Sequence, residues 1–112
     1  MMVCVPVTRD GLVDPRWGRA DRVAIAEVSA SGVGDWQEFD VGWGTLHDEG
    51  TEGSHHARVA RFLLDHHVEA VVVDHMGDPM MRMLQQMGLE VHLGAGGDAR
   101  QAAMAVNDSE PN

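Results

Sequence analysis

The 112-residue sequence contains no lysine, a single cysteine and no long apolar run. Its eight basic residues are all arginines, and eighteen acidic residues outnumber them to give a formal charge of −10. A surface of this charge repels the phosphates of nucleic acids and of anionic membranes, and it gains nothing from the release of counterions. Neither a nucleic acid nor a membrane is therefore expected as a partner.

The scarcity of cysteine and of apolar runs also narrows the class of protein. Cys4 alone forms neither an intrachain disulfide nor a CxxC pair, and its place in an apolar run indicates a buried small residue. No stretch is long enough to span a bilayer, and the N-terminus lacks a charged region followed by an apolar core. We expect a cytoplasmic protein with one domain over residues 1–106 and a disordered tail over 107–112.

Hydrophobic patterning predicts three strands, followed by helices that alternate with two more strands. The predicted strands cover residues 3–8, 23–28, 35–41, 69–73 and 90–93, and the predicted helices cover 54–67, 78–87 and 98–106. The run 69–73 lacks polar alternation, as in a parallel strand covered on both faces. The two helical crossovers require parallel pairing, whereas the first three strands are close enough to form a meander. The expected fold is a mixed five-stranded α/β sheet with about three helices.

Residue types at the helix boundaries support these ranges. Ser54, Asp78 and Asp98 are predicted N-caps, and Pro79 suits a first helical position. In the first helix, the predicted buried face consists of Ala57, Ala60, Leu63 and Leu64, and Val59 and Phe62 widen it. In the second helix, it consists of Met80, Met83, Leu84 and Met87. Residues 42–53 contain four glycines and are predicted to form a flexible surface loop.

Six of the seven histidines lie between His47 and His75. His75 and Met76 follow the exit of the fourth predicted strand, where imidazole and thioether donors suit a metal or a metal cluster. His55 and His56 stand at the start of the first helix. Because adjacent helical residues point about 100° apart, only one of these two is expected to face a site.

His66 and His67 fall in the last turn of the same predicted helix. A cationic imidazole there meets the negative end of the helix, which gives this second pair a structural role. We therefore rank it low as a source of metal ligands.

Two segments of the sequence carry motifs that point to a known family. Val5-Pro6-Val7-Thr8 followed by Asp14-Pro15-Arg16-Trp17-Gly18-Arg19-Ala20 resembles the VPVT strand and the S-P-H-F-G-R-A-like segment of the dinitrogenase iron–molybdenum cofactor biosynthesis family. Met87-Gly88-Leu89-Glu90-Val91, leading into Leu93-Gly94-Ala95-Gly96-Gly97, is similar to the family's G-I-x-V and G-A-G-G. The resemblance spans roughly residues 3–106. It implies a ribonuclease-H-like fold and a protein, not an enzyme, that binds or carries an iron–sulfur or iron–molybdenum cluster or its precursor, with a cofactor-assembly or acceptor protein as a possible partner.

The sequence departs from the family pattern in two places. Arg16 stands where the family usually has histidine, and 74–77 replaces a glycine-rich G-G-x-G loop. The site is therefore expected to be rebuilt around other donors. The predicted cofactor contacts are His75, Met76, Gly77 and Arg19, and the predicted metal ligands are His75, His47, His55 and His56. These residues converge if the first helix and the exit of the fourth strand share one edge of the sheet.

Backbone and cationic groups offer a second means of recognition. The N–H groups around Gly77 and Asp78 suit an anion at a helix start, and Arg16 and Arg19 suit the charge of an anionic ligand. The glycine-rich stretch 94–97 is interpreted as a plain turn.

Three other function classes deserve comparison. A two-metal nuclease needs converging carboxylates with one on the first strand, and residues 3–8 contain no acid. A mononuclear zinc or nickel site would use His47, His55 or His56, His75 and Asp74, although no compact signature such as HExxH is present. A metal-free regulatory or interaction module would use Trp43, among glycines, as an exposed contact.

Overall fold

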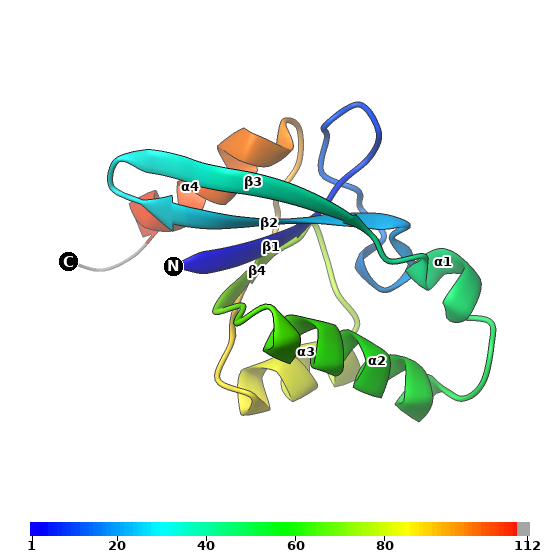
Figure 1. The fold of residues 1–112 in the computed structure, drawn as a ribbon. Coiled ribbons are helices and arrows are strands. Elements are labelled where there is room, and N and C mark those ends of the chain that lie inside the picture. Colours follow the sequence, from blue (N-terminus) through cyan, green and yellow to red (C-terminus); the bar gives the residue numbers. More distant parts are fainter. Residues whose placement is uncertain (110–112) are drawn as a thin grey trace.

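The computed structural model describes residues 1–109, and its five strands form one mixed sheet (Figure 1). The strands are β1 (Met2–Pro6), β2 (Arg22–Ser29), β3 (Gly32–Asp40), β4 (Ala70–Val72) and β5 (Glu90–His92). Their spatial order is β3-β2-β1-β4-β5. The pairs β1–β2 and β2–β3 are antiparallel, and β4 is parallel to both β1 and β5. The predicted meander followed by a parallel half is confirmed.

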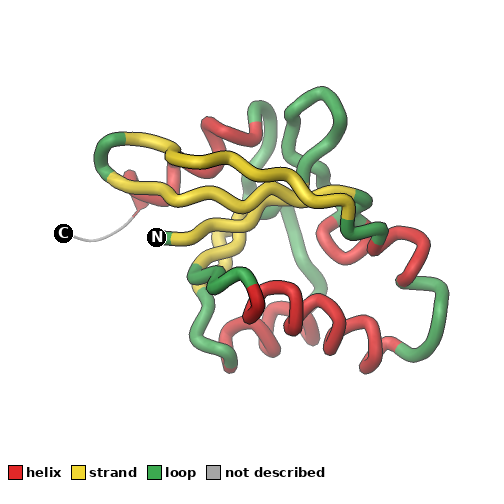
Figure 2. Tube along the Cα trace, viewed as in Figure 1, coloured by secondary structure: helices red, strands yellow, loops and turns green. Residues whose placement is uncertain are grey.

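Helices cover both faces of the sheet. Helices α2 (Glu52–Asp65) and α3 (Asp78–Gln86) lie on one face, and α4 (Ala99–Ser109) lies on the other (Figures 1 and 2). Alternation along β1 explains the two cores, because Val3 and Val5 pack on the α4 side while Cys4 packs on the α2 and α3 side. This arrangement confirms the expected ribonuclease-H-like α/β fold.

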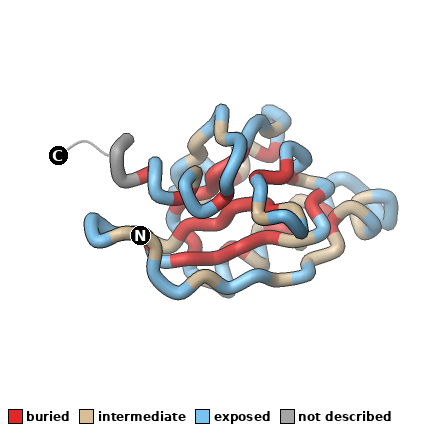
Figure 3. Tube along the Cα trace, turned by 90° about the horizontal axis from the view of Figure 1, so that it is seen from above, coloured by how far each residue is buried: buried red, intermediate tan, exposed pale blue. Residues whose placement is uncertain are grey.

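Burial is concentrated along the central strands (Figure 3). Val71 is fully buried between neighbours on both sides, as the uninterrupted apolar run predicts. Cys4 is also fully buried, and its burial raises the pKa of the thiol. The cysteine is therefore part of the core and is held as the unreactive thiol.

The segment 42–53 differs from the predicted flexible loop. It contains the short helix α1 (Trp43–Leu46), and Trp43 is buried, so the prediction of an exposed contact there is wrong. The Trp43 ring packs edge-on against Trp17, at 5.1 Å between ring centroids, and against Phe62, at 5.8 Å. Trp17 belongs to the 3-10 helix η1 (Trp17–Arg19). A tertiary aromatic contact, which local glycine content cannot reveal, therefore orders this segment.

Helix α2 begins earlier than predicted, and its buried face agrees with the prediction only in part. Its N-cap is Thr51, which exchanges hydrogen bonds with Ser54 in a reciprocal capping box, each backbone N–H lying 3.0 Å from the other residue's hydroxyl. The buried residues of α2 are His55, Val59 and Leu63, and the last two lie in the core between the helices and the sheet, as predicted. The prediction that Ala57 and Leu64 are buried is wrong, since both are exposed.

Helix α2 also ends two residues before the predicted end at residue 67. The helix ends at Asp65, and the ring of His66 packs against Phe39 at 4.7 Å and Phe62 at 4.4 Å between centroids. His67 is exposed in the left-handed region, with φ of 56°. The His66–His67 pair lies outside the predicted site, as expected.

The last two helices follow the predictions closely. Helix α3 has Gly77 as its N-cap, so Asp78 is its first residue and, contrary to prediction, makes no side-chain cap bond. Met80 and Leu84 are buried, as the methionine spacing predicts. Asp98 caps α4 by accepting a hydrogen bond from the Gln101 N–H at 2.9 Å.

Helix α4 continues to Ser109, beyond the predicted end at residue 106. Part of the predicted tail over 107–112 is thus helical, and residues 110–112 lie outside the described residues. Across residues 1–109, no helix is both long and apolar enough to cross a bilayer.

Candidate functional site

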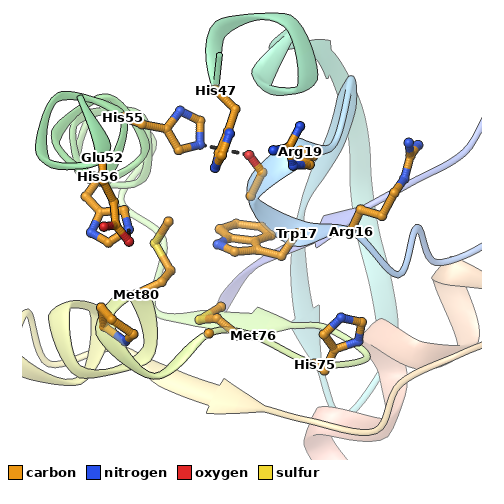
Figure 4. A pocket seen from close by; sticks show the side chains of 13 residues that line it. Arg16, Trp17, Arg19, His47, Glu52, His55, His56, His75, Met76 and Met80 are labelled. Carbon is orange, nitrogen blue, oxygen red and sulfur yellow. Dashed lines mark hydrogen bonds and ion pairs between the residues drawn. The ribbon is translucent and has the colours of Figure 1, made fainter. Parts of the chain in front are cut away.

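A pocket of about 320 Å³ lies between the loop that follows β4 and the start of α2 (Figure 4). Its walls come from η1, the connection between α1 and α2, the first turn of α2 and the loop between β4 and α3. All seven residues predicted from the sequence line it: His47, His55, His56, His75, Met76, Gly77 and Arg19. The expected convergence is therefore present. The pocket lies beyond the carboxyl end of β4, where open α/β sheets bind ligands.

The loop after β4 supplies the most accessible donors. The side chain of His75 is 74% exposed, and its Nδ1 lies 3.4 Å from a carboxylate oxygen of Asp74. Met76 is partly buried and packs against the core shared with α2 and α3. This loop therefore offers one open imidazole and one thioether toward the pocket (Figure 4).

Two further imidazoles face the pocket from the other wall and are loosely held. The Nε2 of His56 lies 3.8 Å from a carboxylate oxygen of Glu52, one turn earlier in α2. The Nδ1 of His47 is buried without a hydrogen-bond partner within residues 1–109, although Asp48 Oδ1 lies 3.6 Å away. Both side chains keep a ring nitrogen for a ligand to engage.

His55 differs from the other three histidines because the protein already uses both of its ring nitrogens. His55 is only 2% exposed. Its Nε2–H donates a hydrogen bond to the Gly18 carbonyl at 2.8 Å, and its Nδ1 accepts one from Arg58 Nη1 at 3.1 Å. Burial, followed by the charges of neighbouring groups, lowers the pKa of His55 below its usual value. His55 and His56 both line the pocket, but only His56 presents an unengaged nitrogen.

The two arginines of the pocket already have acidic partners. Arg16 donates to the Asp14 carboxylate through its backbone N–H at 2.9 Å, Nε at 3.2 Å and Nη2 at 3.1 Å. These contacts raise the pKa of Arg16, and Asp14 itself is buried. Arg19 Nη1 lies 3.6 Å from Asp48 Oδ1. The charge that these guanidinium groups offer to an anionic ligand is therefore partly offset.

Sequence reasoning missed five residues that line the pocket: Trp17, Gly18, Glu52, Pro79 and Met80. Trp17 is buried between the histidine wall and Met76 (Figure 4), and its indole N–H has no hydrogen-bond partner in the described part of the chain. Met80 lies in the first turn of α3, four residues after Met76, and adds a second thioether to the lining.

The donors occupy different walls of the pocket. Considering only residues 1–109, no three His, Cys, Asp or Glu side chains are grouped so that they could hold one metal ion. Chemically, the pocket combines imidazoles, thioethers and an aromatic wall in a partly apolar setting.

The sheet order, the helical layers and this pocket define an α/β protein of ribonuclease-H-like fold with a donor-lined site at the strand ends. The chain belongs to the family described as dinitrogenase iron–molybdenum cofactor, which matches residues 1–109. No curated protein matches it.

Three solved structures illustrate the shared fold. The apo form of the orange protein from Desulfovibrio gigas is 22% identical, with a TM-score of 0.71 over 94% of this chain and 85% of that chain. A putative NifB protein from Thermotoga is 21% identical, with a TM-score of 0.70 over 96% and 88%. A putative dinitrogenase from Methanocaldococcus jannaschii is 11% identical, with a TM-score of 0.67 over 95% and 86%. At these identities the likeness concerns the fold.

Proposed function

We propose that this protein carries an iron–sulfur or iron–molybdenum type cluster, or its precursor, and catalyses no reaction. The observation that supports the proposal is that His47, His56 and His75 reach one pocket from three separate segments. Membership of the iron–molybdenum cofactor family points to the same class of cargo.

The donor set suits a cluster that must be both held and released. Imidazole and thioether groups bind iron, and sulfide fills most coordination positions of a cluster, so a few protein ligands suffice. Because a cluster contains several metal atoms, donors on opposite walls can bind different atoms. We propose His75 as the principal ligand, with His56 and His47 opposite it and Met76 as a weaker donor.

The backbone adds a further contact for an anionic cargo. Gly77 is the N-cap of α3, and no side chain caps the N–H groups of the first turn. Such groups attract negative charge. Gly77 and Arg19 therefore complete the proposed set of cofactor contacts.

The proposed partner is a cofactor-assembly or acceptor protein in the cytoplasm. The partner would load or receive the cluster at the open side of the pocket, where His75 is exposed. A mononuclear zinc or nickel site, or a metal-free interaction module, would be the alternative function.

The test is anaerobic addition of a pre-formed iron–sulfur or iron–molybdenum cofactor to the metal-free protein, with visible absorbance read after gel filtration. We expect colour to co-elute at a fixed stoichiometry, because these clusters absorb visible light. Zinc binding without colour would indicate the single-ion site, and no binding of either would indicate the interaction module.

A matched pair of variants then tests the ligand assignment. His75→Ala removes an exposed imidazole of the pocket, and His66→Ala removes one that packs on phenylalanines outside it. We expect His75→Ala to weaken cluster retention about tenfold or more, a loss typical of a metal-site contact. His66→Ala should bind as the wild type does. Equal retention by the two variants would contradict the assignment.

A further inference from the structure

We infer that His55 is the positioning residue of this pocket and not one of its ligands. Its buried imidazole joins η1 to the start of α2 and so fixes the distance between two pocket walls. The inference rests on the proposed function, because it divides roles among the histidines of that site.

The hydrogen bonds of His55 allow one arrangement of its ring. The Gly18 carbonyl can only accept, so Nε2 must carry the proton, and the Arg58 guanidinium can only donate, so Nδ1 must be the acceptor. These two bonds, at 2.8 Å and 3.1 Å, use both nitrogens of a neutral imidazole. A metal could bind His55 only by displacing one of them.

The ring of His55 also connects α1 to the junction, by which we mean the place where η1 and the start of α2 meet. Arg58 Nη1 also lies 3.4 Å from the Leu46 carbonyl of α1, and the ring of His47 packs edge-on against His55 at 4.9 Å between centroids. Figure 4 shows His55 beside His47, with a dashed line to the η1 segment. Segments η1, α1 and α2 therefore meet at one buried side chain.

The neighbouring histidine has none of these attachments. Within residues 1–109, the ring of His56 has only an approach of 3.8 Å to Glu52, which leaves its Nε2 able to exchange this partner for a ligand. Adjacent residues on α2 thus serve different purposes: His55 holds the wall, and His56 points a donor from it.

The first test is hydrogen exchange of the metal-free protein, which requires no cluster. His55→Phe keeps a ring of similar size but removes both hydrogen bonds. We expect exchange to rise about tenfold at the amides of Arg19 and Ala20 in the η1 turn and at Trp43 and His47 in α1, with the α3 amides unchanged. Wild-type exchange throughout, or an equal rise in α3, would overturn the inference.

Two further variants separate the two attachments of His55. His55→Gln retains a side-chain N–H donor for Gly18 and should restore most of the η1 protection. Arg58→Met leaves His55 in place and should loosen α1 alone, which keeps the test decisive if His55→Phe does not fold. His67→Asn is the matched control, because this exposed histidine lies outside the pocket and asparagine tolerates its left-handed backbone. Unaltered α1 exchange in Arg58→Met would count against the junction.

Cluster retention then distinguishes support from ligation. With pre-formed iron–molybdenum cofactor as the probe, His55→Phe should retain about tenfold less cluster and His55→Gln should recover it. His56→Gln should lose cluster with exchange rates unchanged. If His55→Gln restored exchange but not retention, His55 would be a ligand and the inference would be wrong. If the wild type retained no cluster, the proposed function would fail, while the exchange experiment would still decide the role of His55.

Discussion

At the scale of single residues, the pocket side chains differ in how fully the protein satisfies them. His75 is open to solvent beside one carboxylate, whereas both nitrogens of His55 have partners within the fold. A group that already has hydrogen bonds must lose them before it binds a ligand, at a net cost of about 1 kcal/mol for each bond. Hydrogen-bond satisfaction therefore ranks His75 and His56 above His55 as ligands.

The buried imidazole of His55 predicts a pH dependence of stability. Its pKa is lowered in the folded state, mainly by burial, whereas the unfolded chain protonates near pH 6.5. The unfolded state therefore binds more protons below that pH, and the stability present above pH 6.5 is lost as the pH falls through the folded pKa.

We expect the Tm to fall further between pH 7 and pH 5 in the wild type than in His55→Gln, which has no titrating group at this position. Thermal unfolding followed by circular dichroism across this pH range measures the difference. Parallel curves for the two proteins would contradict the prediction.

Gly44 permits the close approach of α1 to the end of η1 and to the residues that follow it. A Cβ at this position would lie 2.7 Å from the Arg19 carbonyl oxygen and 3.1 Å from Asp21 Oδ1. Since the nearer atom is backbone, Gly44→Ala should lower the free energy of unfolding by about 1–3 kcal/mol. Denaturant titration measures this, with Gly96→Ala as the control because a Cβ there meets nothing within 4 Å. Equal stability of the two variants would be inconsistent with this account.

At the scale of elements, the start of α2 determines how the pocket wall is built. The Thr51–Ser54 capping box satisfies two backbone N–H groups just before the pair His55–His56. Fraying of this turn would move both histidines. The cap is therefore part of the architecture of the site as well as of the helix.

Thr51→Ala should lower the free energy of unfolding by about 1 kcal/mol, because it removes the side-chain acceptor for the Ser54 N–H. We also expect faster hydrogen exchange over the first turn of α2. Thr45→Ala provides the comparison, since Thr45 is exposed on α1 and outside the capping box. A lower free energy of unfolding in Thr51→Ala alone would agree with the prediction, and an unchanged free energy in both variants would refute it.

The elements that sequence reasoning predicted are those whose signal is local. The apolar run at β4 and the methionine spacing of α3 are readable without knowledge of neighbours. Helix α1 was not predicted because its stability depends on the contact of Trp43 with Trp17, a residue 26 positions earlier in the chain. The buried face of α2 was predicted correctly at Val59 and Leu63 but not at Ala57 and Leu64, because the apolar stripe is wider than the part that the sheet covers.

The candidate site likewise has a part that local sequence predicts and a part that depends on tertiary contacts. The rule that ligands bind at strand ends predicted that His47, one of the pair His55 and His56, and His75 converge. The burial of His55 depends on a carbonyl at Gly18 in a distant segment, which no local pattern shows. Local sequence therefore indicated which histidines line the pocket, and tertiary structure was needed to show which of them already have hydrogen-bond partners.

At the scale of the whole molecule, the net charge of −10 opposes the approach of an anionic cluster. Arg16 and Arg19 soften this repulsion at the pocket only in part, because Asp14 and Asp48 lie beside them. Salt screens charges that are farther apart than about 10 Å more than it screens close pairs.

Cluster binding should therefore become faster as ionic strength rises from about 0.01 M to 0.1 M, where the Debye length falls from about 30 to 10 Å. Stopped-flow absorbance with a pre-formed cluster measures the association rate. A rate that falls with salt would show that the pocket arginines outweigh the net charge.

The edge-on contact between Trp17 and Trp43 also has an optical consequence. Trp17 lines the pocket, and Trp43 packs on it from α1, whereas Trp36 packs on the opposite side of the sheet beneath Arg100. We expect an iron-containing cargo to quench the fluorescence of the first two indoles and to leave more of the emission from Trp36. The loading and release of a cluster can therefore be followed by the tryptophan emission of the unlabelled protein, in which Trp36 serves as the internal reference.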